Sequence, residues 1–490
     1  MARNVSSRDL ISCLLCFNPA CSKACPKNIN PGKILRSLRF ENYIGAIEKI
    51  NGECINCSAP CEKSCVVDNV RIKEILSRCY NEKNIHNIEI KRANLKSDIC
   101  GIPIENPFLL SSSIVASTYD MCKRALEAGW AGVAFKTISL IDIHEASPRY
   151  SALKNLDGSF QAFKNIEQLY DHSIDEGFEI IKRLKKEFPS KFILVSIMGR
   201  DEDEWKFLAK KAEESMADAL ELNFSCPNMT EDDTGSDVGQ IPRLVESFTK
   251  AVKESVKIPV LAKLTPNVMT MSPAAIAAKR GGADGIALIN TIKSITELNI
   301  IQKLLDKKWD RKIAVGGLSG SSVKPIALRF LAEVAQNEEL KGMHLSAMGG
   351  IYNYKDALMF LSLGAKSLQL TTAVMEYGYR IIEDLTEGLS TFLGSAGIEL
   401  KDLCGASINN VVDIKEMKRD IVIYPKFGRT SCVGCGRCYI SCMDGGHQAI
   451  KLVDNKPQLD TNKCVGCHLC ILVCPEGAIQ SSGVEVKLNK

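Results

Sequence analysis

The sequence contains no run of about 18 apolar residues, the length that a membrane-spanning helix requires. Its first ten residues, MARNVSSRDL, lack the apolar core of a secretion signal, and we expect a cytoplasmic protein. Long runs of lysine and arginine are also missing, and the formal net charge is only +4 over 490 residues. Nucleic acids and membrane surfaces therefore have no support as partners.

A dinucleotide fingerprint of the form G-x-G-x-x-G is a further absence. Such a fingerprint normally follows the first strand of a doubly wound sheet that binds NAD or FAD. The stretches GGLSGSS and SAMGGI do not match it, although both suit loops whose backbone N–H groups approach a phosphate. The chain is 45% hydrophobic and 24% charged, a composition that allows a large globular core. Its 490 residues are sufficient for two or three domains.

Cysteine is abundant: the sequence has 21, with eight inside residues 13–65 and eight inside residues 432–474. In a large chain without a secretion signal, such a number favours metal sites over disulfides. The sixteen clustered cysteines would suffice for four centres with four ligands each.

The C-terminal cysteines form two runs with C-x2-C-x2-C-x3-C spacing, SCVGCGRCYISC and KCVGCHLCILVCP. This is the bacterial two-cluster ferredoxin pattern, in which the fourth cysteine of each run ligates the other cluster. We expect residues 401–490 to be a connector followed by this domain, with zinc as the alternative. One [4Fe–4S] cluster would take Cys432, Cys435, Cys438 and Cys474, and the other Cys464, Cys467, Cys470 and Cys442.

Residues 1–95 are predicted to form a short helical iron–sulfur domain with two further [4Fe–4S] clusters. The first run has C-x2-C-x4-C-x3-C-P spacing, which favours iron–sulfur over a structural zinc ion. The second run is GECINCSAPCEKSC, where Cys79 is the alternative to Cys54 as fourth ligand. We assign the first cluster to Cys13, Cys16, Cys21 and Cys25, and the second to Cys54, Cys57, Cys61 and Cys65.

Residues 96–400 alternate short apolar segments with segments of helical periodicity, such as 203–216 and 244–256. Eight strand–helix units in about 300 residues predict an α/β fold of the TIM (β/α)8 barrel type, with a doubly wound sheet as the alternative. The expected strands are Phe108–Leu110, Gly132–Phe135, Phe192–Ile197, Ala219–Leu222, Val260–Leu264, Gly285–Ile289, Met343–Ser346 and Ser367–Leu370.

Polar residues at the ends of these strands point to a shared ligand. Lys136 in GVAFKTIS and Lys263 in PVLAKL interrupt apolar strands, where a buried lysine is costly unless it faces an anion or a polar ligand. Asn290 and Thr291 close a third strand, GIALINT. A fourth strand, ALELNFSCPN, opens into a long polar loop of the kind that forms lids and binding loops.

The motifs NPFLLSSS, AGVAFKTIS, ELNFSCPN, AKLTPN, GADGIALINT, GGLSG and SAMGGI occur in this order. Together they resemble the flavin barrel of the dihydropyrimidine dehydrogenases, within the wider dihydroorotate dehydrogenase family. The N-terminal region is similar to the iron–sulfur domain of those enzymes and of the small subunit of glutamate synthase. The resemblance implies FMN and reduction of the 5,6 double bond of uracil or thymine, or its reverse. A hydride would pass from FMN N5 to C6, and a proton to C5.

The same resemblance implies roles for single residues. Lys263 would stabilise the anionic reduced flavin as well as contact it. The residues implied to bind FMN are Ser111, Ser112, Lys136, Lys263, Gly320, Gly349, Gly350 and Thr371. Amide side chains suit a pyrimidine because each offers a donor and an acceptor. The residues implied to hold it are Asn165, Asn223, Asn290 and Thr291.

Two positions depart from the animal enzymes of this family. Their proton-donating cysteine precedes Gly-Gln, where this chain has Val238. Ser236 is the nearest candidate for the catalytic acid, although a hydroxyl is a weak acid unless it is activated. The next candidates are Cys226, whose place at the strand end NFSCPN favours a structural role, Asp237 and a bound water. A glutamine completes their second N-terminal cluster, and Leu76 stands at that place, so Cys54 is assigned instead.

Electrons must reach the flavin from another protein. Residues 66–105 are too few for the FAD and NADPH domains that the single-chain animal enzyme carries there. The resemblance therefore implies the pyrimidine-reducing subunit of a complex with an FAD/NAD(P)-binding partner, or one served by a free electron carrier. The resemblance is also compatible with a homodimer. Two other functions also stay open: a flavin dehydrogenase acting on dihydroorotate or another cyclic imide, and an electron-transfer subunit with an inactive barrel.

Overall fold

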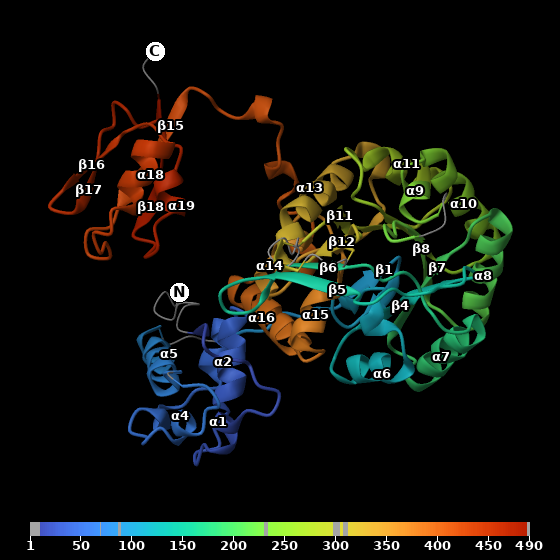
Figure 1. The fold of residues 1–490 in the computed structure, drawn as a ribbon, viewed down its shortest axis with the longest axis horizontal. Coiled ribbons are helices and arrows are strands. Elements are labelled where there is room, and N and C mark those ends of the chain that lie inside the picture. The colour runs from blue at the N-terminus through green and yellow to red at the C-terminus, as the bar shows by residue number, and fades with distance from the viewer. Residues whose placement is uncertain are drawn as a thin grey trace. The chain divides into compact units, whose positions relative to one another are not determined.

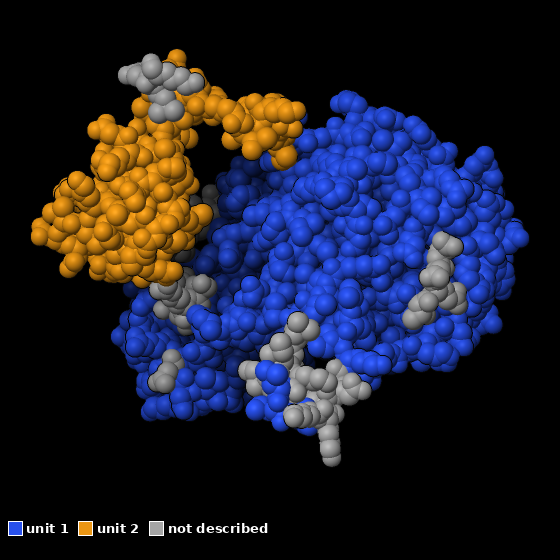
Figure 2. All heavy atoms as spheres, turned by 45° about the horizontal axis from the view of Figure 1, so that its top comes forward, with its two compact units in different colours: residues 1–410 blue, residues 411–490 orange. Residues whose placement is uncertain are grey.

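The computed structural model describes residues 10–68, 70–86, 90–229, 234–296, 304–306 and 312–487. The chain forms two compact units, residues 1–410 and residues 411–490 (Figures 1 and 2). Across the described ranges, each helix is too short or too polar to span a lipid bilayer.

Unit 1 is built around a closed barrel of eight parallel strands (Figure 1). The closed barrel confirms the predicted TIM fold. The doubly wound alternative is wrong, because every barrel strand has a hydrogen-bonded neighbour on both sides. In chain order the strands are β3 (Phe108–Leu110), β4 (Gly132–Ser139), β7 (Phe192–Met198), β8 (Ala219–Phe224), β9 (Val260–Leu264), β10 (Gly285–Leu288), β13 (His344–Met348) and β14 (Ser367–Leu370).

Every residue of these eight strands is buried. Parallel strands are covered on both faces, which explains why they read as nearly continuous apolar runs. Charged side chains interrupt the runs at Lys136, Glu221 and Lys263. Burying these charges is costly unless each is compensated, so they mark the part of the barrel that requires a functional explanation.

Helices surround the barrel (Figure 1). The predicted helical segments 203–216 and 244–256 correspond closely to α8 and α10. Asp201 caps α8 by accepting hydrogen bonds from the backbone N–H groups of Asp203 and Glu204. The main helices are α6 (Tyr119–Glu127), α7 (Ile174–Glu187), α8 (Glu202–Glu214), α10 (Pro242–Ser255), α11 (Ser272–Arg280), α13 (Lys324–Ala335), α14 (Tyr354–Ser362) and α16 (Ile381–Ala396).

A four-stranded sheet, not predicted from the sequence, lies among the loops that follow the barrel strands. Its strand order is β11-β12-β6-β5, and all its pairings are antiparallel. The strands are β5 (Tyr150–Lys154), β6 (Phe160–Asn165), β11 (Ile292–Ser294) and β12 (Gly316–Ser319). The sheet joins loops that follow β4 and β10, and it brings Asn165 beside Gly317.

The N-terminal region is helical, with its own small apolar core. Ile34, Leu35 and Leu38 of α2 pack there with Ala46 and Ile47 of α3. Asn30 and Asn42 cap these two helices by accepting hydrogen bonds from Lys33 N and Gly45 N. The helices are α1 (Ala20–Lys23), α2 (Pro31–Arg39), α3 (Tyr43–Glu48), α4 (Pro60–Lys63) and α5 (Ile72–His86).

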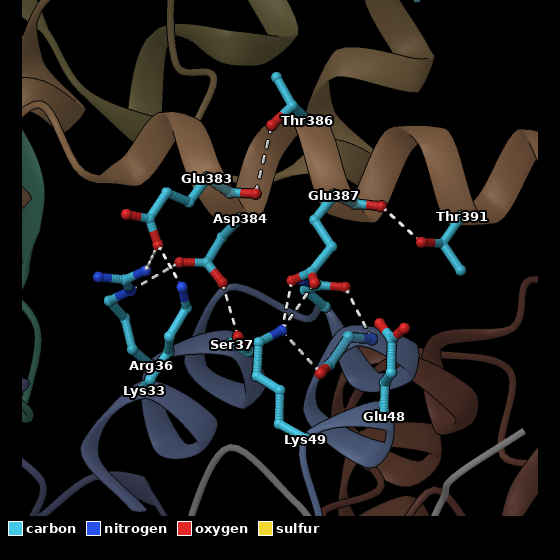
Figure 3. A network of polar contacts seen from close by, with 12 residues as sticks. Lys33, Arg36, Ser37, Glu48, Lys49, Glu383, Asp384, Thr386, Glu387 and Thr391 are labelled. Atoms are coloured by element: carbon cyan, nitrogen blue, oxygen red, sulfur yellow. Dashed lines mark hydrogen bonds and ion pairs between the residues drawn. The ribbon is translucent and has the colours of Figure 1, made fainter. Parts of the chain in front are cut away.

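Ion pairs attach the N-terminal helices to α16 on the outside of the barrel (Figure 3). Arg36 Nε lies 2.7 Å from Asp384 Oδ2, and Arg36 Nη2 lies 2.7 Å from Glu383 Oε2. Lys49 Nζ lies 2.6 Å from Glu387 Oε2 on the next turn. Asp384 is only 1% exposed, so this contact is a buried interface.

In its described residues, 411–487, unit 2 contains two antiparallel strand pairs and two α-helices. Strand β15 (Ile421–Phe427) pairs with β18 (Ile479–Lys487), and β16 (Ile450–Val453) pairs with β17 (Lys456–Leu459). Each helix begins inside one of the two cysteine runs. These helices are α18 (Arg437–Gly445) and α19 (Leu469–Leu472).

Candidate active site and iron–sulfur centres

A cavity opens where the barrel strands end, between the strand ends and the added sheet; we call it the barrel cavity. In TIM barrels the carboxyl ends of the strands carry the active site. Of the residues predicted to bind the flavin, to bind the substrate or to act as the acid, all but one line this cavity: Ser111, Ser112, Lys136, Asn165, Asn223, Lys263, Asn290, Thr291, Gly320, Gly349, Gly350 and Thr371. The structure brings them together, and their individual roles remain predictions.

Ser236 is the exception. It is buried in the short helix α9 (Ser236–Gly239), where its backbone N–H donates to the carbonyl of Cys226. It is not among the residues that line the barrel cavity, whereas Cys226 is. Burial raises the pKa of the Cys226 thiol to about 11. At neutral pH, Cys226 therefore carries a proton beside the cavity.

Lys263 is held in a buried polar network. Its Nζ lies 2.7 Å from Ser112 Oγ and 3.0 Å from Glu221 Oε1, and Ser112 Oγ donates to the same carboxylate oxygen at 2.6 Å. Gln369 Nε2 donates to the other carboxylate oxygen at 3.0 Å and to Ser346 Oγ at 3.1 Å. Both oxygens of Glu221 are thus hydrogen-bonded inside the barrel.

The charge state of Glu221 follows from these contacts. Burial alone would raise the pKa of this carboxyl, because a low dielectric disfavours the charged form. The Lys263 ammonium and the hydrogen bonds from Ser112 and Gln369 outweigh burial and hold the pKa below its ordinary value. Glu221 and Lys263 therefore form a buried ion pair rather than a neutral pair.

Lys136 has different surroundings. Its Nζ is buried and has no hydrogen-bond partner, and its nearest carboxylate oxygen, Glu167 Oε1, lies 3.8 Å away. An ammonium carries three donors, and buried donors are nearly always satisfied. An acceptor atom of a ligand in the cavity would complete this site. The orphaned lysine therefore fits a polar ligand such as the flavin ring or a pyrimidine carbonyl.

The amides of the site are linked by hydrogen bonds. Asn223 Nδ2 donates to Thr137 Oγ1 at 2.9 Å, and Asn290 Nδ2 donates to Ser225 Oγ at 2.8 Å. Ser225 Oγ in turn donates to Asn223 Oδ1 at 2.8 Å. Thr291 N donates to Asn290 Oδ1 at 2.7 Å. The two asparagines are thus joined through one serine, which fixes their orientation along one wall of the cavity.

Glycine backbones shape the part of the cavity after β13. Gly349, Gly350 and Gly320 have φ of 120°, 81° and 90°, which side-chain-bearing residues rarely adopt. A Cβ on Gly350 would lie 3.0 Å from both the Gly320 carbonyl oxygen and the Lys324 backbone nitrogen. This close approach of bare backbone, between the end of the seventh barrel strand and the end of β12, fits a phosphate group such as that of FMN.

The cysteines of unit 2 surround two hollows. Cys432, Cys435, Cys438 and Cys474 line one, and Cys442, Cys464, Cys467 and Cys470 line the other. These are the two sets expected from the exchange of the fourth cysteine. Backbone N–H groups donate to the exchanged thiols, from Ala449 to Cys442 at 3.2 Å and from Ala478 to Cys474 at 3.3 Å. Within the described residues, no His, Cys, Asp or Glu side chains converge as a single-ion site would require.

The N-terminal cysteines are grouped differently from the assignment made by order in the sequence. One hollow is lined by Cys25, Cys54, Cys57 and Cys61. Cys65 instead lies near the first run. Burial raises the pKa of the Cys13 thiol, and the neighbouring sulfurs of Cys21, Cys16 and Cys65 raise it further, so Cys65 is close to Cys13. Around this hollow and the first run, Cys25 and Cys65 have thus changed places relative to the order in the sequence. The cluster that each cysteine ligates stays a prediction.

The physical reason lies in the short helices. Cys25 and Cys65 each follow one of the two four-residue helices, α1 and α4, which contact each other. Each helix carries the chain across to the neighbouring group of thiols. Cys54 keeps its place as a ligand candidate, whereas Cys79 is buried on α5 and lies outside the set.

Comparison with known proteins decides the family. The family model "Dihydroorotate dehydrogenase" matches residues 94–393, and "4Fe-4S dicluster domain" matches residues 427–481. The chain belongs to the dihydroorotate dehydrogenase family. It is 47% identical over 359 residues to the "NAD-dependent dihydropyrimidine dehydrogenase subunit PreA" of Escherichia coli, covering 73% of this chain and 87% of that protein.

More distant members of the family agree. The "Dihydropyrimidine dehydrogenase (NADP(+)), chloroplastic" of Arabidopsis thaliana is 32% identical, over 61% of this chain and 73% of its own. The catalytic subunit of "Dihydroorotate dehydrogenase B (NAD(+))" from Pyrococcus horikoshii is 34% identical, over 64% and 98%. The dihydroorotate dehydrogenase of Eimeria tenella in complex with ferulenol has the same fold, with a TM-score of 0.53 at 18% identity over 65% of this chain and 90% of that one.

Membership of this family makes the chain a dihydropyrimidine dehydrogenase-like oxidoreductase that acts on CH–CH groups. The family barrel implies FMN, and the dicluster domain implies iron–sulfur clusters in unit 2. Sequence reasoning missed Glu221, Gln369 and Ser346 in this barrel. The acidic residue inside the buried strand ALELNF was the available signal, because a strand buried on both faces rarely contains an unpaired carboxylate.

Proposed function

We propose that the chain reduces the 5,6 double bond of uracil and thymine, or catalyses the reverse reaction, with electrons delivered through iron–sulfur clusters. The observation that carries the proposal is the barrel cavity, where the predicted flavin and substrate residues come together. The similarity to dihydropyrimidine dehydrogenases of bacterial and plant origin supports the choice of substrate class.

FMN would lie against Ser111 and Ser112, with Lys136 and Lys263 beside its ring and its phosphate at the loops of Gly320 and Gly350. Thr371, whose Oγ1 lies 3.1 Å from Ser113 Oγ, would complete the phosphate end. When bound, FMN supplies the hydride for C6 of the pyrimidine. Lys263 is held in place by Ser112 and Glu221 before any ligand arrives, so its charge is preorganised.

The pyrimidine would be held at its C=O and N–H edge by Asn165, Asn223, Asn290 and Thr291. The hydrogen bonds through Ser225 leave part of each amide free to face the cavity. Asn165 comes from the added sheet, where its Nδ2 donates to the Gly317 carbonyl at 3.3 Å. The substrate is thus clamped between the barrel and that sheet.

The proton for C5 is assigned to Cys226 in place of Ser236, because Cys226 lines the cavity and Ser236 is buried in α9. The raised pKa keeps the Cys226 thiol protonated at neutral pH, as an acid in the reducing direction must be. Asp237 is exposed on the same short helix and does not line the cavity.

Four [4Fe–4S] clusters are proposed, two in the N-terminal region and two in unit 2. Four thiols around each of three hollows form donor sets suited to such clusters, and Cys13, Cys16, Cys21 and Cys65 are the remaining four. The electrons would come from an FAD- and NAD(P)-binding partner subunit, since the relative from Escherichia coli is named an NAD-dependent subunit and this sequence has no dinucleotide fingerprint. A cytoplasmic location is the matching expectation.

A substrate panel tests the proposal. Purified protein with bound FMN would be assayed anaerobically with an artificial electron donor and, separately, uracil, thymine, orotate and an unsaturated cyclic imide. We expect uracil and thymine to be reduced and orotate to be a poor substrate. Preference for orotate would favour the dihydroorotate dehydrogenase alternative, which the 34% identical Pyrococcus subunit keeps open. Loss of all turnover in flavin-loaded protein would favour the electron-transfer subunit.

A further inference from the structure

A fully buried carboxylate stands behind the lysine assigned to the flavin. Glu221 is 0% exposed, and it comes from β8, whereas Lys263 comes from the neighbouring strand β9. In the register of these strands, Glu221 pairs with Leu261 and Lys263 pairs with Asn223. The two charged residues are therefore offset by two pairs along the sheet, which places their side chains on the same face, and their charged ends meet at 3.0 Å.

In the part of the chain that the structure describes, the hydrogen bonds of the Glu221 carboxylate all come from this buried network. One carboxylate oxygen receives Lys263 Nζ and Ser112 Oγ, and the other receives Gln369 Nε2. Gln369 is itself fixed by Ser346. Three side chains from three strand regions thus converge on one carboxylate that does not line the barrel cavity, and a fourth side chain fixes one of them.

A buried ion pair is seldom a net source of stability, because desolvating both charges costs about as much as their attraction returns. An apolar pair of similar volume would pack this barrel without that cost. The network is therefore better explained by the charge it controls than by the stability it adds. Lys263 lines the cavity and Glu221 does not, so the lysine is the member that acts on a ligand.

We propose that Glu221 is a positioning residue that holds Lys263 at Ser112 and balances its charge, and that it thereby sets the reduction potential of the bound flavin. The inference rests on the flavin site proposed above. A lone cation beside the flavin would stabilise the anionic reduced form and make it a weaker hydride donor. With its charge balanced, Lys263 can still donate a hydrogen bond without binding the reduced form too tightly.

The test measures the flavin reduction potential by anaerobic spectroelectrochemistry in the full-length protein. Glu221→Gln keeps the shape of the side chain and removes its charge. We expect the potential to shift to a more positive value, with faster flavin reduction by an artificial donor and slower pyrimidine reduction. A potential that is unchanged or more negative would overturn the proposal.

Asp384→Asn is the matched control. Asp384 is 1% exposed and paired with Arg36 in the contact with α16, so this change removes an equally buried and equally paired carboxylate outside the barrel cavity. The flavin potential of this variant should equal that of the unmodified protein. An equal shift in both variants would show that Glu221 has only a structural role.

A double-mutant comparison separates action through Lys263 from a direct action on the flavin. In a Lys263→Met background, Glu221 has lost its cation and should take up a proton, as unpaired buried carboxyls do. Glu221→Gln should then leave the potential unchanged. A shift as large as that in the unmodified background would contradict a role exercised through Lys263.

The same set of variants covers the case in which Glu221→Gln does not retain flavin. If the unbalanced lysine is the cause, the Glu221→Gln/Lys263→Met protein, which has no net charge at the pair, should bind FMN again. If the double variant also fails to bind FMN, Glu221 holds the shape of the cavity and the proposal is wrong. Failure of the unmodified protein to bind FMN would instead refute the proposed function itself.

Discussion

Two lysines interrupt apolar barrel strands, and the structure treats them differently. Lys263 Nζ is held by Ser112 and Glu221, whereas Lys136 Nζ has no hydrogen-bond partner. A group fixed before the ligand arrives costs no reorganisation during the reaction. Lys263 is thus suited to stabilising charge, while Lys136 gains a partner only from what enters the barrel cavity.

Lys263→Ala is expected to slow pyrimidine reduction by roughly 100-fold or more, the usual effect of removing a preorganised charge. The iron–sulfur absorbance and paramagnetic resonance signals should persist, since Lys263 lies on β9 and the sixteen clustered cysteines lie elsewhere in the chain. Lys164→Ala is the control, because Lys164 is also buried but does not line the cavity. Equal rates for the two variants would refute the placement of Lys263 at the flavin.

Cys226→Ala should slow uracil reduction by roughly 100-fold, the scale of a general acid, while Ser236→Ala changes it little. The pH dependence has a defined sign. The thiol has its pKa raised to about 11, and it donates only while protonated. The rate should therefore stay level from about pH 7 to about pH 10 and fall as the pH approaches that pKa. If Ser236→Ala instead slowed uracil reduction strongly and Cys226→Ala changed it little, Ser236 would be the acid.

Most of the candidate site could be predicted because its residues follow buried strands, and parallel strands deliver their ends to one edge. Glu221 and Gln369 could not be placed that way. In the sequence, Glu221 is 42 residues from Lys263 and 148 residues from Gln369. Only closure of the barrel brings these side chains together. The place of Ser236 was missed for a related reason, because the fold of the loop, not its composition, turns α9 inward.

Helix α16 connects the barrel to the N-terminal region through three acidic residues, Glu383, Asp384 and Glu387. Arg36 and Ser37 of α2 both bind Asp384, and Lys49 binds Glu387 (Figure 3). The guanidinium of Arg380, just before α16, donates to the Cys16 carbonyl at 3.1 Å. The same segment of the barrel thus holds both the helices and the first cysteine run.

Asp384→Leu should destabilise this contact by about 3 kcal/mol, because Arg36 loses its buried partner and keeps only Glu383, whose side chain is 45% exposed. Urea-induced unfolding and limited proteolysis of the N-terminal region would measure the loss. The double variant Arg36→Met/Asp384→Leu should recover much of it, since an apolar pair replaces the ion pair without an unpaired charge. Equal losses in the single and double variants would show that the ion pair is not what holds the region.

Fold elements were predictable to different degrees. The eight barrel strands were located from their apolar runs, because strands buried on both faces have little choice of residue. The sheet β11-β12-β6-β5 was not, since its strands are short and partly exposed and β11 and β12 lie in a loop. The exchange of Cys25 and Cys65 was missed because each follows a helix of only four residues, too short to leave a periodic pattern.

At the scale of the whole molecule, cysteine sets of the same kind occur in both units. In unit 2 the fourth cysteine of each run joins the other set, and in the N-terminal region Cys25 and Cys65 do the same. If each set holds a cluster, each run of cysteines would be linked to its neighbour through shared centres. Replacing one cysteine should therefore disrupt the centre to which that cysteine belongs in this grouping.

Iron analysis tests both the number and the pairing of the centres. Four [4Fe–4S] clusters require about sixteen iron atoms per chain. The variant Cys25→Ser/Cys54→Ser should retain about twelve, because both residues belong to one centre, and Cys21→Ser/Cys25→Ser about eight, because they belong to two. The opposite pattern would restore the grouping by order in the sequence.

The central claim is that the barrel cavity transfers electrons from a flavin to a pyrimidine. The most direct measurement is a single turnover: the protein is reduced anaerobically with an artificial donor, the excess donor is removed, and uracil is added while flavin absorbance is followed. The account predicts that the flavin is reoxidised and that dihydrouracil forms in proportion to the reduced protein, and that Cys226→Ala slows this step by roughly 100-fold. Flavin that stays reduced in the presence of uracil, with no dihydrouracil formed, would contradict it.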